Sequence, residues 1–214
     1  MYEYDVPGAL RPGGTPLTRR LLAMGGDLYG KSVLDLGCGR GETVTVLSRE
    51  YGSIVTGVDI SEKMTEEGKN ACPEAEFLQA DAGMLPFSDG SFDAVVSECS
   101  FSVFDDPGKV FAEVKRILKK GGSLLMSDLC QKGGILPGKG MVRNLYTPEE
   151  WNTMLLRAGF ETVSTEDAGK ALSEMYIQMI LDEGIERANE RIGLCLGKDE
   201  MKKVSYMLFF ARSI

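Results

Sequence analysis

Short apolar runs alternate with amphipathic stretches through the first two thirds of the chain. The runs have the length and turn-rich borders of buried strands, and they cover residues 33–36, 54–58, 75–79, 92–96 and 123–126. Between them, apolar residues recur at helical spacing over 42–51, 61–71 and 107–120. Strands and helices that alternate in this order predict an α/β fold with a parallel sheet between two layers of helices.

The pattern changes at both ends of the chain. Residues 1–15 are rich in Pro and Gly and predict an irregular arm, and Thr15-Pro16 before a leucine-rich stretch predicts a helix capped by Thr15. Near the other end, a capped helix from 146 to 159 precedes strands at 160–165 and 204–211, with a helical insertion at about 170–197. We expect one domain over 1–214, with an N-terminal arm and helix in 1–30.

The insertion carries a stripe of Met and Tyr side chains, among them Met175, Tyr176 and Met179. Such a stripe at helical spacing forms part of the core more often than it forms a lid over a substrate. We therefore expect the stripe to pack into the core.

Nine residues, Val33 to Gly41, hold the most informative pattern, VLDLGCGRG. A buried strand runs into a turn with three glycines, so the backbone can lie close to a ligand. A dinucleotide site has the spacing GxGxxG, whereas this turn has GxGxG followed by Glu42, whose charge would repel a pyrophosphate. A cationic ligand without phosphate suits this turn better, and S-adenosylmethionine, with its sulfonium and ammonium, is such a ligand.

Acidic residues follow the next strands. Asp59 stands 22 residues after Gly37, where parallel-sheet nucleotide sites place a carboxylate for the ribose hydroxyls, although it could also be a helix cap. Asp81 follows the third strand, where a turn residue would be unremarkable. The fourth strand ends in Ser97-Glu98-Cys99, which should face a ligand. Taken singly, Cys99 could be a small packed residue and Glu98 a solvated one.

These motifs together resemble the class I S-adenosylmethionine-dependent methyltransferases. The resemblance rests on the acid-x-Gly-x-Gly-x-Gly turn, on LPFSDGSFD at 85–93 and on VKRILKKGGSLLMSD at 114–128. It is strongest over about 16–165 and is nearest to the small-molecule branch with the ubiquinone/menaquinone methyltransferases. It implies a Rossmann-like three-layer α/β/α sandwich whose seven-stranded sheet has the order 3-2-1-4-5-7-6, with the last strand antiparallel.

The resemblance also implies a cofactor, S-adenosyl-L-methionine, with S-adenosyl-L-homocysteine as product, and a small-molecule methyl acceptor. The residues that it assigns to the cofactor are Asp35, Gly37, Cys38, Gly39 and Gly41 for the methionine end, Asp59 for the ribose, Asp81 and Ala82 for the adenine, and also Ile60 and, at the end of the fourth strand, Ser97. By position alone, Glu98 and Cys99 are the catalytic candidates, and Tyr146 is expected to border the acceptor pocket. Histidines found in this loop in many members are replaced by Ser102 and Val103.

Composition narrows the possible chemistry. The 214 residues carry a net charge of −8, which argues against nucleic acid as a partner. The chain has no histidine, which excludes His-based triads and His-ligated metals, and we expect no metal. Its five cysteines include no CxxC pair and predict reduced thiols, and no apolar run reaches the roughly 20 residues of a membrane span. We expect a cytoplasmic protein.

Three alternatives remain open at this point. One is a thiol or metalloid methyltransferase, because Cys99 resembles the loop cysteine of arsenite methyltransferases and Cys130 ends the next strand. The others are an NAD-dependent enzyme, disfavoured by Glu42, and a non-catalytic protein that binds S-adenosylmethionine. The sequence does not identify the acceptor or the oligomeric state. Acceptor specificity should depend on the arm, the 131–142 loop and the insertion.

Overall fold

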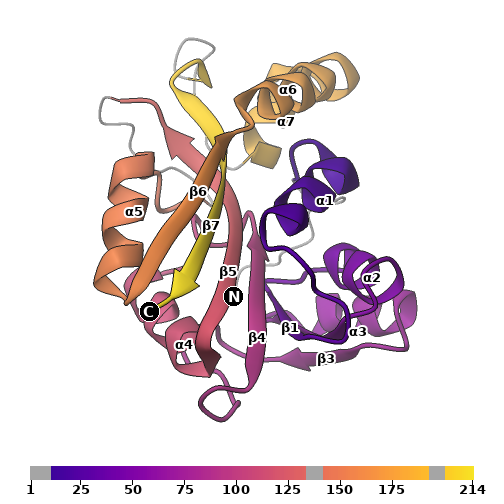
Figure 1. Ribbon diagram of the computed structural model, residues 1–214. Helices are drawn as coiled ribbons and strands as arrows, with labels where there is room; N and C mark the ends of the chain where they lie inside the picture. The colour runs from indigo at the N-terminus through magenta and orange to yellow at the C-terminus, as the bar shows by residue number, and fades with distance from the viewer. Residues whose placement is uncertain (1–10, 134–141, 193–200) are drawn as a thin grey trace.

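A seven-stranded sheet forms the centre of the computed structural model, which describes residues 11–133, 142–192 and 201–214 (Figure 1). The strand order is β3-β2-β1-β4-β5-β7-β6, as predicted. Strands β1 to β5 run parallel, and β7 is antiparallel to both β5 and β6. The strands are β1 (Ser32–Leu36), β2 (Ile54–Asp59), β3 (Glu76–Gln79), β4 (Phe92–Glu98), β5 (Leu118–Gln131), β6 (Phe160–Asp167) and β7 (Val204–Ser213).

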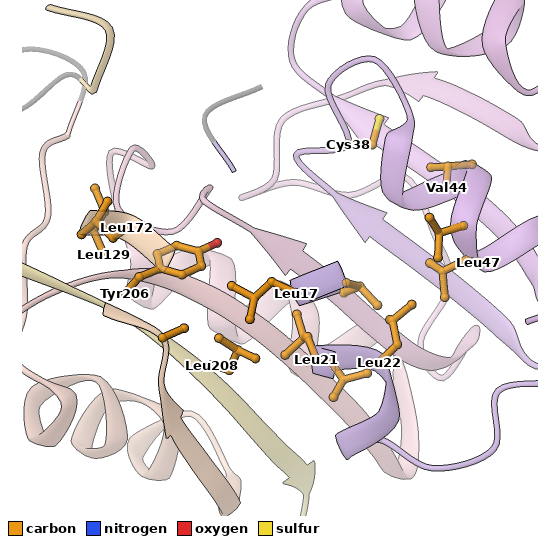
Figure 2. Close-up of a cluster of buried hydrophobic side chains, with 14 of the residues drawn as sticks. Leu17, Leu21, Leu22, Cys38, Val44, Leu47, Leu129, Leu172, Tyr206 and Leu208 are labelled. Atoms are coloured by element: carbon orange, nitrogen blue, oxygen red, sulfur yellow. The ribbon is translucent and has the colours of Figure 1, made fainter. Parts of the chain in front are cut away.

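Helices cover both faces of the sheet, because successive residues of each buried strand point to opposite sides. Alternate residues of β7, such as Leu208 and Phe209, belong to two different buried clusters. The cluster with Leu208 (Figure 2) includes residues of α1 (Gly14–Met24), α2 (Glu42–Arg49), α6 (Gly169–Glu183) and α7 (Ile185–Ile192). The cluster with Phe209 includes residues of α4 (Pro107–Ile117) and α5 (Pro148–Arg157). Helix α3 (Glu62–Ala71) connects β2 to β3.

Local capping signals locate three of the helix starts in the described part of the chain. Ser61, Asp106 and Thr147 each accept a hydrogen bond from a backbone N–H in the first turn of the following helix, and Thr147 forms a full capping box with Glu150. The predicted cap at Thr15 is wrong. Helix α1 begins two residues earlier, at Gly14, after Gly13, whose left-handed backbone (φ 72°) turns the chain into the helix without a side-chain cap.

The end of α4 also differs from the prediction. The cations and glycines at 119–122 were expected to close the helix, but α4 ends at Ile117 and Leu118 already has extended backbone geometry. Leu118 pairs with Phe92 of β4, so residues 118–122 extend β5 beyond the predicted strand. Pairing with the neighbouring strand outweighs the local helix-end signal.

The helices α6 and α7 lie between β6 and β7 in the chain. Tyr176 and Met179 of the Met/Tyr stripe are buried, as expected of core side chains. The rest of the predicted insertion, the first ten residues of the arm and most of the 131–142 loop lie outside the described residues. Among the helices of the described part, none is long and apolar enough to cross a membrane.

Candidate functional site

A cavity of about 630 Å³ opens at the carboxyl ends of β1, β2 and β4. Strand β1 lies between β2 and β4, so the chain's connections leave it in opposite directions at this point of the sheet. Ligands of open α/β sheets bind in the crevice that this change of direction creates. Residues from the glycine turn, from the ends of the first four strands and from the arm, α6 and α7 line the cavity.

The glycine turn supplies one wall. The backbone N–H groups of Gly37 and Cys38 both donate to the carbonyl of Val58, at 2.8 and 2.9 Å, which holds the turn against β2. A Cβ at Gly37 would lie 2.2 Å from Ser100 Oγ, so no side chain fits there. Gly39 also has a left-handed backbone (φ 51°), but a Cβ there would meet nothing within 4 Å. The turn therefore presents bare backbone to open space.

Asp35 lies behind this turn at the end of β1. Its side chain is buried, and Oδ2 has no hydrogen-bond partner among the described residues. Burial raises the pKa of Asp35 to about 8, and the nearby negative charge of Glu98 adds to the shift while Arg11 opposes it. A buried carboxyl group with one unused oxygen on the cavity wall is suited to a cationic ligand group.

Asp59 connects the turn to the next helix. One carboxylate oxygen accepts from the Gly39 N–H at 2.9 Å, and the other accepts from the Ser61 N–H at 2.9 Å. Asp81 accepts from the Gly83 N–H at 2.8 Å. The cap of α3 is Ser61 and not Asp59, whereas Asp81 does hold a turn. Asp59 and Asp81 both line the cavity, where each can also contact a ligand.

Exposed apolar surface lies beside these acids. Ile60 is 63% exposed and lines the cavity, as does Ala82. An apolar side chain of this size on a cavity wall offers a flat ligand ring a packing surface.

Glu98 is buried in a polar network and is not the solvated residue that one interpretation expected. Its side chain is 6% exposed and accepts hydrogen bonds from Thr43 Oγ1 at 2.7 Å and from Thr18 Oγ1 at 3.0 Å. Arg11, at 7% exposure, donates to Glu98 at 3.4 Å and to Glu42 at 2.9 Å. The network ties the arm and α1 to the end of β4. Sequence reasoning missed Arg11, because it lies in a stretch without periodicity.

Cys99 follows Glu98 in a strained conformation. Among the described residues it is the one non-glycine with a positive φ, 55°. Its sulfur lies 2.9 Å from the Tyr206 hydroxyl, which lies 2.7 Å from Ser127 Oγ. Burial raises the pKa of the Cys99 thiol, so the thiol stays protonated near neutral pH and is a poor nucleophile. Cys130 is buried and does not line the cavity.

Three of the predicted site residues lie outside the cavity lining. Ser97 is buried and donates to the Leu36 carbonyl at 2.9 Å, between β4 and β1. Gly41 lets Phe77 pack against α2, since a Cβ there would lie 2.6 Å from that ring. Tyr146 packs edge-on against Trp151 at 4.9 Å, in the cluster on the other face of the sheet. Asp35, Gly37, Cys38, Gly39, Asp59, Ile60, Asp81, Ala82, Glu98 and Cys99 line one continuous cavity.

The insertion contributes cavity residues that the sequence did not assign. Leu172 and Met175 of α6 and Ile192 of α7 line the cavity, together with Val142 and Arg143 from the segment before Tyr146. The Met/Tyr stripe thus splits between core and cavity. Its helical spacing marked a buried face, but periodicity does not distinguish a core from a ligand pocket.

The cavity fits a cofactor with a cationic amino-acid end. The unused oxygen of Asp35 and the open space over Gly39 are the two features that such a group requires. In the part of the chain that the structure describes, no group of His, Cys, Asp and Glu side chains could hold a metal ion.

Comparison with known proteins agrees with this geometry. Residues 34–126 match a family model described as "Methyltransferase domain". The 27-O-demethylrifamycin SV methyltransferase of Amycolatopsis mediterranei is 32% identical over 186 residues, covering 79% of this chain and 68% of its own. The demethylmenaquinone methyltransferase of Renibacterium salmoninarum is 35% identical over 147 residues, covering 68% of this chain and 60% of its own.

A solved structure shares the fold. Geranyl diphosphate C-methyltransferase from Streptomyces coelicolor, in complex with S-adenosyl-L-homocysteine, superimposes with a TM-score of 0.75 at 21% identity, over 93% of this chain and 80% of that one. The sheet order, the glycine turn with its acids, the matching family model and the rifamycin relative agree. The chain belongs to the class I S-adenosylmethionine-dependent methyltransferases.

Proposed function

We propose that this protein transfers a methyl group from S-adenosylmethionine to a small-molecule acceptor inside the cavity. The proposal depends on one feature of the cavity wall formed by Asp35 and the glycine turn. There, the buried Oδ2 of Asp35 has no hydrogen-bond partner among the described residues, and the space over Gly39 is open. The named relatives, a 27-O-demethylrifamycin SV methyltransferase and a demethylmenaquinone methyltransferase, support a small acceptor. Bound S-adenosylmethionine would supply a sulfonium methyl group that a nucleophilic atom displaces in one step.

Different residues of the cavity bind different parts of the cofactor. Asp35 receives the ammonium of the methionine end, and the backbone of the glycine turn lies against that end. Asp59 accepts from the ribose hydroxyls, since each carboxylate oxygen can accept a second hydrogen bond beside the one it already makes. Asp81 and Ala82 bind the adenine edge, and Ile60 packs on the ring.

Glu98 has a different role in this proposal. Direct displacement depends on alignment of the reacting atoms and on exclusion of water more than on covalent catalysis. Glu98 lies on the cavity wall, where it can orient the acceptor or receive its proton, and Arg11 and two threonines fix its position. Cys99 shapes the wall beside it, with its thiol bonded to Tyr206. The protonated thiol does not favour the metalloid alternative.

Calorimetry with S-adenosylhomocysteine tests the cofactor assignment. Asp59→Ala should weaken binding at least tenfold, because it removes the ribose acceptor and the bond that holds Gly39. Asp27→Ala, at an exposed turn residue before β1, is the matched control and should bind as the wild type does. Unchanged affinity in Asp59→Ala would disprove the ribose assignment.

A metabolite screen for release of S-adenosylhomocysteine tests the activity. Release with at least one fraction of cell metabolites identifies an enzyme. Tight cofactor binding with no release in any fraction would favour the non-catalytic alternative. A Cys99→Ser protein that turns over normally would rule out the thiol mechanism.

The same proposal places the protein in the cytoplasm and gives it no nucleic-acid partner. Cys38, Cys72, Cys99 and Cys130 are free thiols, as in proteins of reducing compartments. The net charge of −8 opposes binding to a polyanion. Cell fractionation and a DNA-binding assay at low salt check these two statements.

A further inference from the structure

The cavity changes character from one end to the other. Asp59 and Asp81 line the end beside β2 and β3. The end beside β5 is lined by five apolar side chains, Leu129, Val142, Leu172, Met175 and Ile192. They come from β5, from the segment that precedes Tyr146, from α6 and from α7. In the view of Figure 2, Leu129, Leu172 and Tyr206 appear on the left and Cys38 on the right.

Charged groups near the apolar end are already paired. Arg143 forms an ion pair with Asp105, and Arg11 pairs with Glu42 and Glu98. Lys109, which also lines the cavity, lies over Gly83 at the adenine end. A charged acceptor entering the apolar end would lose its hydration without gaining an unpaired counter-charge from the described residues.

Polar groups at the inner wall are similarly committed. The Cys99 thiol is bonded to Tyr206, and Ser100 Oγ donates to the Glu98 carbonyl. The Glu98 carboxylate, which several side chains hold in place, lines the cavity at the end of β4, and β4 lies between β1 of the cofactor half and β5 of the apolar end. One neutral hydrogen-bond donor on the acceptor could be accommodated there.

We propose that the methyl acceptor is an uncharged, mainly apolar molecule. Its apolar part lies among the five apolar side chains, and its reacting atom lies beside Glu98 and Cys99. This inference rests on the proposed function, because it divides the same cavity between donor and acceptor. Helices α6 and α7 then determine acceptor choice, while the ends of β1 to β4 determine the cofactor.

Model ligands test the charge and the apolar character separately. The probes are 4-propylphenol, 4-butylphenol, 4-pentylphenol and 4-hexylphenol, compared with 4-hexylbenzoate and 4-hexylbenzylammonium. Each is titrated by calorimetry into protein saturated with S-adenosylhomocysteine. We expect affinity to rise about fourfold with each added methylene, as burial of apolar surface predicts, and both charged analogues to bind at least tenfold more weakly than 4-hexylphenol. Equal or tighter binding of a charged analogue, or no dependence on chain length, overturns the inference.

Three substitutions at two positions on α6 test where the probe binds. Met175→Glu puts a charge on the apolar wall and should weaken 4-hexylphenol binding at least tenfold. Leu181→Glu is the matched control, since Leu181 is on the same helix but 74% exposed and outside the cavity lining, and its affinity should not change. Met175→Ser, which removes apolar surface without adding charge, should weaken binding about threefold or more. Equal losses in Met175→Glu and Leu181→Glu overturn the inference.

The affinity for S-adenosylhomocysteine distinguishes a failure of the proposed function from a failure of the acceptor inference. All three variants should bind S-adenosylhomocysteine as the wild type does. If the wild type does not bind S-adenosylhomocysteine, the proposed function fails, and the phenol series on the free protein still reports whether the apolar end takes neutral ligands. If the cofactor binds and the phenols do not, the acceptor inference alone is wrong.

Discussion

Binding of S-adenosylhomocysteine should release a proton from Asp35. The pKa of Asp35 in the free protein is raised to about 8, chiefly by burial, so the carboxyl group is mostly protonated at pH 7. The ammonium of the ligand favours the ionised form and lowers this pKa in the complex. The free protein therefore holds a proton below pH 8 that the complex does not.

The size of the effect follows from the pKa. At pH 7, a group with a pKa of about 8 is roughly nine-tenths protonated, so binding should release about 0.9 proton from this site. The dissociation constant should fall about tenfold from pH 6 to pH 7 and level off above pH 8. Calorimetry at pH 7 in buffers of different ionisation enthalpy gives the number of protons released.

Asp35→Asn is the control, because asparagine cannot titrate. The ligand's own amino group, that of a free amino acid, loses its proton at higher pH than Asp35, and the variant records any contribution from it alone. The difference between wild type and variant is the proton of Asp35. Equal proton release by the two proteins would refute the assignment of the ligand ammonium to Asp35.

Three further predictions concern the turn and the buried network. Gly37→Ala should destabilise the protein by about 2 kcal/mol or more in urea unfolding, because its Cβ would lie 2.2 Å from Ser100 Oγ; unchanged stability would contradict this packing. A Cβ at Gly39 would meet no other atom within 4 Å, so Gly39→Ala should lower the free energy of unfolding by about 1–2 kcal/mol, the cost of the left-handed backbone. The same substitution should weaken the binding of S-adenosylhomocysteine at least tenfold in calorimetry. Arg11→Met should cost about 3 kcal/mol by leaving Glu98 buried without its counter-charge, and adding Glu98→Gln should recover part of that loss; additive losses would show that the pair is not coupled.

The donor half of the site was largely predictable because its signals are local. The glycine turn directly follows β1, so the pattern at 33–41 is one continuous structural unit. Parallel pairing then sets the position of Asp59: Leu36 pairs with Val58, which brings the residue after Val58 to the same edge as the turn. Neither step requires knowledge of side-chain packing.

The acceptor half was not predictable, because it depends on which way side chains point after packing. Ser97 and Glu98 are neighbours at the end of β4, and both were candidates. Strand alternation sends Ser97 to the Leu36 carbonyl in the sheet, whereas Glu98 reaches the cavity. Tyr146 was expected at the pocket, but an edge-on contact with Trp151 holds it on the other face. The role of Arg11 could not be predicted, because Arg11 contacts Glu98 only once the arm has packed against the end of β4.

Glu98 lies where these two halves meet, and its surroundings explain how the acceptor half can change independently of the donor half. Its hydrogen-bond donors, Arg11, Thr18, Thr43 and Ser127, come from the arm, α1, α2 and β5, and none comes from the described part of the insertion. Leu172 and Met175 line the cavity without making any of these bonds. A substitution on α6 therefore alters the shape and polarity of the acceptor end while Glu98 and Asp35 keep their positions. Variation in α6 and α7 is the physically simplest route to a different acceptor on an unchanged cofactor site.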